Sequence, residues 1–246
     1  MTTNILWTGG WDSTFRVLDL VLIKKQSIQP YYILDYRRTS TDMELKTMEK
    51  IKQMIYEIDP TAKRLIADTI KTDIKEIPKD NKISEDYQYL ASKSHLGDQY
   101  DWLARYVKYN KVDNLELCIH RDDKAEGFIS KDVRKVKTDR DSYYILNDKP
   151  SLPEMLIFSY YRFPLLDMTK LDMEQISKKQ GFKHIMEETW FCYRPTRKGE
   201  PCGLCNPCKY TIEEGLGRRI PKVSFYRKTR HNVGKLKRKI LNKVKS

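Results

Sequence analysis

Short apolar runs alternate along the chain with longer segments in which apolar residues recur every three or four positions. The runs have the length of buried strands, and the longer segments have the period of helices packed on one side. The pattern predicts strands over 4–7, 31–35, 64–67 and 115–119, and helices over 14–24, 42–58, 100–109 and 171–180. A short helix over 151–158 and a short apolar segment over 163–166 follow the same rhythm. This alternation indicates an α/β protein with a doubly wound, mostly parallel sheet.

One polar stretch, residues 122–148, follows neither period. We expect it to be an insertion or a mobile loop over a site. Its basic residues are typical of a solvated face, with a lid over phosphate groups as the alternative; they are Lys131, Arg134, Lys135 and Lys137.

Charge is distributed unevenly over the 246 residues, which carry a net charge of +13. Residues 217–246 hold 12 Lys or Arg and no acid, whereas the first 216 residues hold 35 basic and 34 acidic side chains. In this basic tail the apolar positions fall on one helical stripe, at Val233, Leu236, Ile240 and Val244. Such a helix suits RNA, an anionic membrane or an acidic protein partner, and the alternative is a solvated terminus packed on the body.

No apolar run reaches the roughly 18 residues that a membrane helix needs, and no secretory signal is visible. The composition, 39% hydrophobic and 11% aromatic, excludes wholesale disorder. We expect a soluble, cytoplasmic protein.

A glycine-rich loop follows the first predicted strand, with the sequence Thr8-Gly9-Gly10-Trp11-Asp12-Ser13-Thr14. Two glycines allow the backbone to bring its N–H groups against an anion, and a helix N-terminus adds unpaired donors. Asp12 has the wrong sign for a phosphate site, which indicates either bound Mg²⁺ or a helix cap. The alternative is an ordinary strand-to-helix turn with Asp12 as the N-cap.

Cysteine spacing gives a second signal. Cys192, Cys202, Cys205 and Cys208 form C-x9-C-x2-C-x2-C, and Cys118 stands apart on a predicted strand. Clustered thiols in a cytosolic chain are typical of metal sites, and four thiolates suit a closed structural Zn²⁺ site. An iron–sulfur cluster is the alternative, although position 212, where a ferredoxin-like run would continue, is Ile212.

The glycine-rich loop resembles the S-G-G-x-D-S signature of the PP-loop ATP pyrophosphatases, with Thr8 in place of serine. The resemblance implies that ATP is split to AMP and pyrophosphate, with Asp12 and Ser13 in catalytic roles. It also implies nucleotide contacts through the loop and the end of the second strand, at Thr8, Gly9, Gly10, Asp12, Ser13, Thr14, Leu34 and Tyr36.

Two further stretches are similar to the 7-cyano-7-deazaguanine synthases. Residues 188–193 and 202–208 match that family's T-W-S-C-Y and C-G-x-C-x-x-C pattern, and Thr169-Lys170 matches its T-K stretch. The resemblance implies an ATP-binding domain over 1–185, a zinc-binding lobe over 186–216 and a basic tail over 217–246. It implies an adenine nucleotide alpha hydrolase-like fold and a reaction of a small carboxylate with ammonia, from 7-carboxy-7-deazaguanine to the nitrile. A homodimer is left open.

The segment after the fourth predicted strand departs from that family. It reads Cys118-Ile119-His120-Arg121-Asp122-Asp123, and a strand end is where open-sheet sites gather. We expect Arg121 and Asp122 to take part in catalysis, and His120 is either a phosphate contact or a packing residue. Two other functions stay open: a PP-loop tRNA-modifying enzyme of the thiolation type, and a zinc-ribbon nucleic-acid-binding protein.

Overall fold

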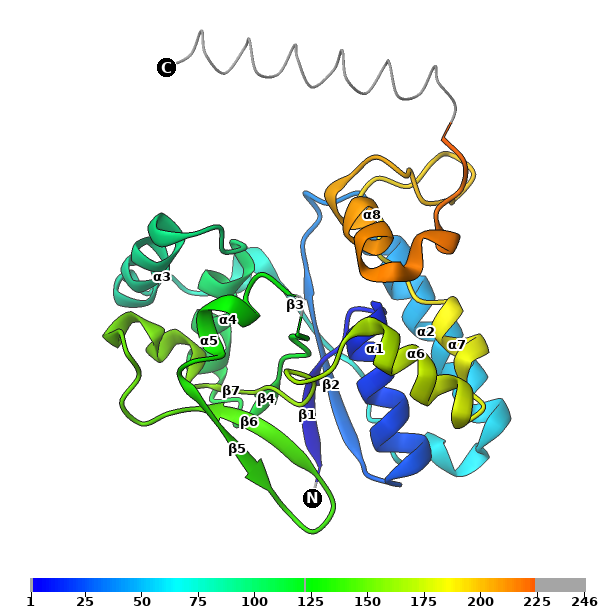
Figure 1. The fold of residues 1–246 in the computed structure, drawn as a ribbon, viewed down its shortest axis with the longest axis horizontal. Helices are drawn as coiled ribbons and strands as arrows, with labels where there is room; N and C mark the ends of the chain where they lie inside the picture. Colours follow the sequence, from blue (N-terminus) through cyan, green and yellow to red (C-terminus); the bar gives the residue numbers. More distant parts are fainter. Residues whose placement is uncertain (1, 122, 224–246) are drawn as a thin grey trace, which may run out of the picture.

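The computed structural model describes residues 2–121 and 123–223. Its central sheet has five strands in the order β3-β2-β1-β4-β7 (Figure 1). The strands are β1 (Thr3–Leu6), β2 (Ile28–Leu34), β3 (Ile70–Asp73), β4 (Leu115–Glu116) and β7 (Tyr161–Arg162). Every neighbouring pair is parallel. The predicted α/β class with a parallel sheet is therefore confirmed.

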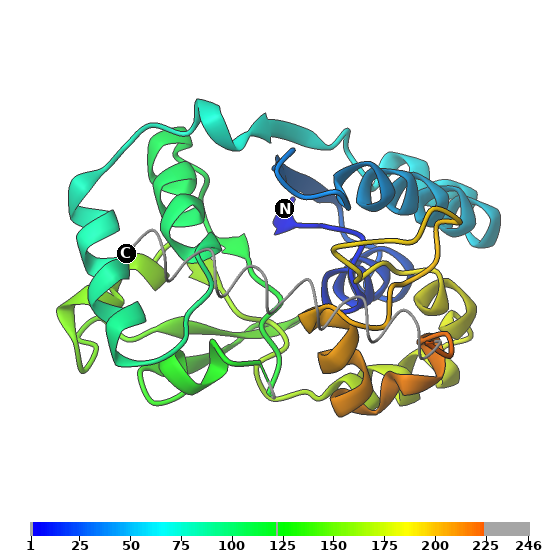
Figure 2. The same ribbon diagram turned by 90° about the horizontal axis from the view of Figure 1, so that it is seen from above.

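Helices cover both faces of this sheet, as the view from above shows (Figure 2). One layer holds α1 (Trp11–Leu18), α2 (Thr41–Ile58), α6 (Lys170–Lys179) and α7 (Lys183–Glu187). The other holds α3 (Asn81–Lys93) and α4 (Gln99–Asn110). Successive side chains of β2 point to opposite faces of the sheet. Tyr32 is buried in the core with α1 and α2, whereas Tyr31 and Ile33 are buried in the core with α3 and α4.

The predicted helices over 42–58, 100–109 and 171–180 agree closely with α2, α4 and α6, but α3 was not predicted and one strand is misplaced. The predicted strand over 64–67 is wrong, because only Ile66 pairs there, in an isolated bridge to Ile28. The third strand is β3, an edge strand whose sequence IKTD has no apolar alternation, and Ile70 is 42% exposed. The predicted helix over 151–158 is a 3-10 helix, Pro153–Phe158, and the apolar segment over 163–166 directly follows β7.

The polar stretch before residue 148 is largely structured, which corrects the expectation of a mobile loop. A short helix, α5 (Glu126–Ile129), precedes an antiparallel hairpin of β5 (Val133–Lys137) and β6 (Ser142–Leu146). Asp141, in the hairpin connection, accepts hydrogen bonds from Arg16 and Lys24. Arg16 is 2% exposed and also makes two 2.7 Å bonds to Glu116 of β4. This buried ion-pair network fixes the hairpin against α1.

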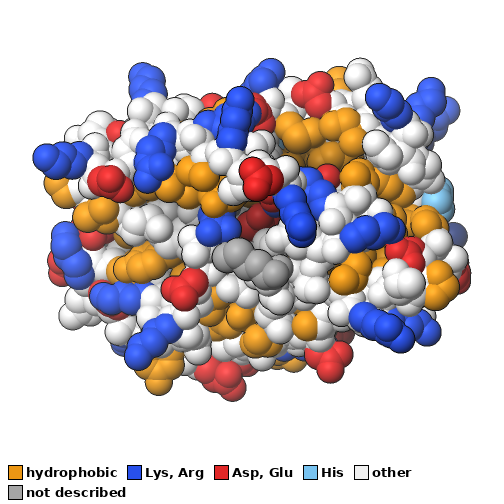
Figure 3. Space-filling view, turned by 90° about the horizontal axis from the view of Figure 1, so that it is seen from below, with side chains coloured by type: hydrophobic (Ala, Val, Ile, Leu, Met, Phe, Trp, Pro, Cys, Tyr) orange, Lys and Arg blue, Asp and Glu red, His pale blue; other side chains and the backbone are white. Residues whose placement is uncertain are grey.

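The C-terminal lobe lies beside α2 (Figure 1) and contains α8 (Asn206–Thr211), followed by a π-helical segment, Ile212–Leu216, and a 3-10 turn, Gly217–Arg219. The predicted amphipathic helix of the basic tail, with Val233 to Val244, lies outside the described residues. Within the part of the chain that the structure describes, no helix has both the length and the apolar character needed to cross a membrane. On the face shown in Figure 3, basic side chains are scattered among acidic and hydrophobic ones.

Candidate functional site

The strand order reverses direction between β1 and β4, which lie side by side at the centre of the sheet. In open parallel sheets, the loops that follow such a pair of strands part and leave a crevice at the carboxyl ends. A pocket of about 190 Å³ lies at this point. Its lining comes from the loop after β1, from α4 and from the segment after β4, and includes Thr8, Gly10, Asp12, Ser13, Cys118 and Asp123.

The conformation of the loop after β1 depends on its glycines. Gly9 has φ +70°, and a Cβ there would lie 3.2 Å from the Glu44 carbonyl oxygen. The Gly9 carbonyl accepts a 2.8 Å hydrogen bond from the Trp190 amide, which ties the loop to the chain leading into the lobe. Gly10 is the N-cap of α1 and offers no side chain to bond the first helical N–H groups. The first turn of α1 therefore has no side-chain cap, and the alternative that Asp12 caps the helix is wrong.

The side chains predicted in this loop divide into two groups. Thr8, Asp12 and Ser13 line the pocket. Thr14 is completely buried, and its hydroxyl accepts a 3.0 Å hydrogen bond from the indole nitrogen of Trp7. The structure thus brings three of the predicted polar side chains to the pocket and turns the fourth into the core.

The predicted residues beyond this loop lie further away. Arg121 is exposed, and its guanidinium donates a 2.5 Å hydrogen bond to the Asp167 carbonyl, away from the pocket. Asp122 lies outside the described residues. Tyr36 lines a separate pocket of about 520 Å³ at the carboxyl ends of β2 and β3, together with Asp35 and Trp102, while Leu34 ends β2.

A cluster of charged side chains adjoins the loop, and the sequence did not predict most of it. Lys170, the first residue of α6, lies 3.7 Å from Asp12 and donates a 2.8 Å hydrogen bond to Glu214. His120 lies 3.8 Å from Asp12 and 3.4 Å from Glu214. The Thr169-Lys170 motif was the only sequence signal for Lys170, and nothing in the sequence marks Glu214.

Several polar atoms of this cluster have no hydrogen-bond partner among the described residues. The His120 ring is 2% exposed, yet among the described residues neither of its nitrogens makes a hydrogen bond. The buried Oδ1 of Asp12 also makes no hydrogen bond within that part of the chain. Buried polar atoms without partners are uncommon, and at a pocket they indicate a position that a ligand would fill.

Burial and mutual attraction shift the titration of these groups. Burial raises the pKa of Asp123, which favours its neutral form. Burial would lower the pKa of His120, but the carboxylates of Asp12 and Glu214 outweigh it and the pKa is raised. For Lys170 burial again opposes the charge, and Asp12 and Glu214 raise the pKa. The carboxylates of the cluster therefore favour the charged forms of His120 and Lys170.

The four cysteines of the lobe come together as predicted. Their sulfur atoms all lie within 4.8 Å of one another, and the measured pairs are 3.4 to 3.8 Å apart. An ion about 2.3 Å from four thiolates in a tetrahedron separates the sulfurs by about 3.8 Å, so the set fits one Zn²⁺. A four-iron cluster would place a cage of iron and sulfide between the thiolates and hold them further apart. Gly203, with φ +72°, makes the tight turn between Cys202 and Cys205.

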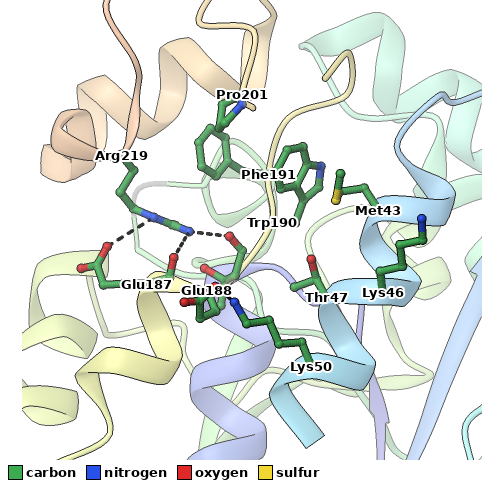
Figure 4. Close-up of a pocket in the computed structure, with 11 residues that line it drawn as sticks. Met43, Lys46, Thr47, Lys50, Glu187, Glu188, Trp190, Phe191, Pro201 and Arg219 are labelled. Carbon is green, nitrogen blue, oxygen red and sulfur yellow. Dashed lines mark hydrogen bonds and ion pairs between the residues drawn. The ribbon is translucent and has the colours of Figure 1, made fainter. Parts of the chain in front are cut away.

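A further pocket, of about 410 Å³, lies between α2 and the lobe and is lined in part by Trp190 (Figure 4). Arg219 reaches into it and donates hydrogen bonds to the carbonyls of Glu187 and Thr189. Its guanidinium also lies 5.0 Å from the ring centre of Phe191. Burial lowers the pKa of Arg219 to about 10. These contacts use the hydrogen-bond donors of the guanidinium. We therefore interpret Arg219 as a residue that holds the lobe against the body.

Two solved structures are similar to this chain. One is the predicted subunit of a tRNA methyltransferase from Methanocaldococcus jannaschii, at 16% identity and TM-score 0.31, covering 77% of this chain and 93% of that one. The other is the U34-tRNA thiolase NcsA from Methanococcus maripaludis, at 12% identity and TM-score 0.30, covering 92% and 84%. Likenesses this weak carry no argument about fold or function.

Sequence comparison is more informative over the C-terminal part of the chain. Residues 158–216, which include the four cysteines, match the family model of Queuosine biosynthesis protein QueC. A 7-cyano-7-deazaguanine synthase from Rhizorhabdus wittichii is 44% identical over 46 residues, which are 19% of this chain and 19% of that relative. The aligned stretch is thus a small part of the relative's length. Together with the glycine-rich loop after β1, these partial matches support a relationship of the chain to QueC and to the PP-loop proteins.

Proposed function

We propose that this protein is an ATP-dependent enzyme that adenylates a small carboxylate, releases pyrophosphate and forms a carbon–nitrogen bond with ammonia. One observation carries the proposal: the uncapped N-terminus of α1 and the Oδ1 of Asp12, which makes no hydrogen bond among the described residues, lie beside His120 and Lys170 at the switch point of the sheet. Backbone donors and cations suit phosphoryl oxygens, and a carboxylate among them suits the divalent ion that accompanies ATP.

In this proposal the chain's own residues bind and orient the triphosphate. The first N–H groups of α1 and the Ser13 hydroxyl donate to phosphoryl oxygens, and Lys170 neutralises charge on the departing pyrophosphate. Asp12 would hold Mg²⁺, which supplies Lewis-acid stabilisation of the leaving group when bound. We place adenine toward Leu34 and Tyr36, at the carboxyl end of β2.

The reaction implied by the synthase family consumes ATP in two successive steps, each of which releases pyrophosphate and then AMP. A carboxylate oxygen attacks the α-phosphorus and pyrophosphate leaves; ammonia then displaces AMP and gives the amide. A second adenylation on the amide oxygen followed by loss of AMP gives the nitrile, as in the conversion of 7-carboxy-7-deazaguanine. Residues 1–185 would bind ATP, residues 186–216 would hold Zn²⁺ in a structural role, and residues 217–246 would form a basic appendage.

The test is product analysis with the full chain. Purified protein is incubated with MgATP and ammonium, with and without 7-carboxy-7-deazaguanine, and AMP, ADP, pyrophosphate and the purine are resolved. We expect AMP and the nitrile, and we expect Asp12→Asn to lower AMP formation at least about 100-fold, the scale of one lost transition-state contact. Asp139→Asn, at an exposed site on the hairpin, is the matched control. AMP formed without dependence on this acid would direct the search to another carboxylate.

A tRNA-modifying activity of the thiolation type is the second candidate, and Cys118 is the observation that favours it. This cysteine lines the switch-point pocket and is separate from the four-cysteine cluster. Burial raises its pKa well above the ordinary value, which disfavours the reactive thiolate. AMP formation that requires tRNA and is lost in Cys118→Ser would support this candidate over the first.

A further inference from the structure

Glu214 occupies the position that an anionic ligand would take at the charged cluster. Its Oε2 accepts a 2.8 Å hydrogen bond from Lys170, and its Oε1 lies 3.4 Å from His120 Nε2. The side chain is only 15% exposed. Burial would raise its pKa, but the close approach of His120 and the hydrogen bond from Lys170 lower it, which favours the ionised carboxylate.

This carboxylate belongs to the lobe rather than to the sheet. Cys208 lies within α8, and the chain passes directly from α8 into the π-helical segment that carries Glu214. A second contact joins the same regions, because Lys124, after β4, donates a 3.1 Å hydrogen bond to the Tyr210 hydroxyl. The lobe therefore presents Glu214 to the loops after β1 and β4.

The charges of the cluster oppose an incoming polyanion while Glu214 is in place. Asp12 and Glu214 lie beside His120 and Lys170, while burial raises the pKa of the neighbouring Asp123. A phosphoryl group at the α1 N-terminus would need those cations and would meet the Glu214 carboxylate as a competitor. Because the nitrogens of buried His120 make ion-pair contacts but no hydrogen bond among the described residues, the present arrangement leaves them incompletely satisfied.

We propose that Glu214 is an internal anion that holds Lys170 and His120 until a phosphoryl group displaces it, and so sets how strongly the site binds its anionic ligand. This inference rests on the proposed function, because it assigns the competing ligand to a phosphate of the nucleotide. The Glu214 side chain is already 15% exposed, and displacement would turn it further toward solvent.

The test measures binding of inorganic pyrophosphate and of ATP, each with Mg²⁺, by titration calorimetry on the full chain. We expect Glu214→Gln to tighten pyrophosphate binding about tenfold, within the usual range of coupling between two ligands of one site. Glu213→Gln removes the same charge from the adjacent exposed position and should leave the Kd unchanged. In a Lys170→Met background the gain from Glu214→Gln should largely vanish, since the contested cation is gone.

The outcomes separate this inference from the proposed function. Unchanged or weaker pyrophosphate binding by Glu214→Gln, with ATP binding intact, would overturn the role of Glu214 alone. Equal tightening in Glu213→Gln would reduce the effect to long-range charge and would also overturn it. Absence of binding of both ATP and pyrophosphate in all variants would reject the proposed function and this inference together. Equal thermal unfolding midpoints for the two glutamine variants would exclude a difference in folding as the cause.

Discussion

The two loops that border the switch-point pocket are built in different ways. The loop after β1 is one contiguous run, and its shape depends on the positive φ of Gly9 and on the helix that begins at once. The segment after β4 offers side chains instead, and the charge of His120 depends on Glu214, far along the chain. The conformation of the glycine-rich loop is thus specified by a short stretch of sequence. A buried charged cluster instead requires residues that only the fold brings together.

Loss of the metal should give the largest change in stability. Its effect should fall mainly on the segment after β4. Cys208→Ser removes a thiolate from the cluster, and loss of a structural metal is expected to cost more than about 4 kcal/mol of unfolding free energy. The full-length protein should contain one Zn²⁺ per chain by elemental analysis, and the variant should contain much less. Because Glu214 follows α8, pyrophosphate affinity should change as well.

Cys118→Ser is the control for this experiment, since Cys118 lies outside the cluster. It should retain the metal. Full metal content in Cys208→Ser, or iron in place of zinc in the parent protein, would contradict the assignment of a four-thiolate zinc site.

A change of Gly9 should give an intermediate effect, confined to the first loop. Gly9→Ala places a Cβ at φ +70° and 3.2 Å from the Glu44 carbonyl oxygen, which we expect to cost about 1–2 kcal/mol. Chemical unfolding measures the stability, and calorimetry measures the accompanying loss of ATP affinity. Gly127→Ala, where an added Cβ meets nothing within 4 Å, should be neutral or slightly stabilising. Equal behaviour of the two variants would show that the glycine loop is not sterically constrained.

The smallest effect should be the pH dependence contributed by His120. Asp12, Asp123, Glu214 and Lys170 surround it, and the two carboxylates nearest to it raise its pKa against the effect of burial. A raised folded-state pKa gives stability that is fully present below the unfolded value of about 6.5 and is lost as pH rises through the folded value. His120→Gln should therefore destabilise the protein more at acidic than at alkaline pH, as measured by urea unfolding across that range. A difference that does not vary with pH would show that His120 is neutral in the folded state.

The sequence predictions agree with the structure where a short local pattern was sufficient to specify the element or the cluster. The period of apolar residues gave α2 and α4 to within one residue at each end. The C-x2-C spacing gave the cysteine cluster. It failed for β3, because an exposed edge strand needs no apolar face, and for the hairpin, whose position depends on the contact of Asp141 with Arg16.

The sequence by itself therefore determined the fold class, the glycine-rich loop and the set of four cysteines. Each of these follows from short-range rules: strand and helix periods, backbone freedom at glycine, and ligand spacing on one turn of chain. Only the tertiary structure decided that Thr14 faces the core, that Arg121 turns toward Asp167, and that Lys170 and Glu214 join His120 beside Asp12. The contacts of Asp12 with His120 and Lys170, and of His120 with Glu214, join residues more than 90 positions apart, and burial affects their electrostatics, which no local pattern in the chain specifies.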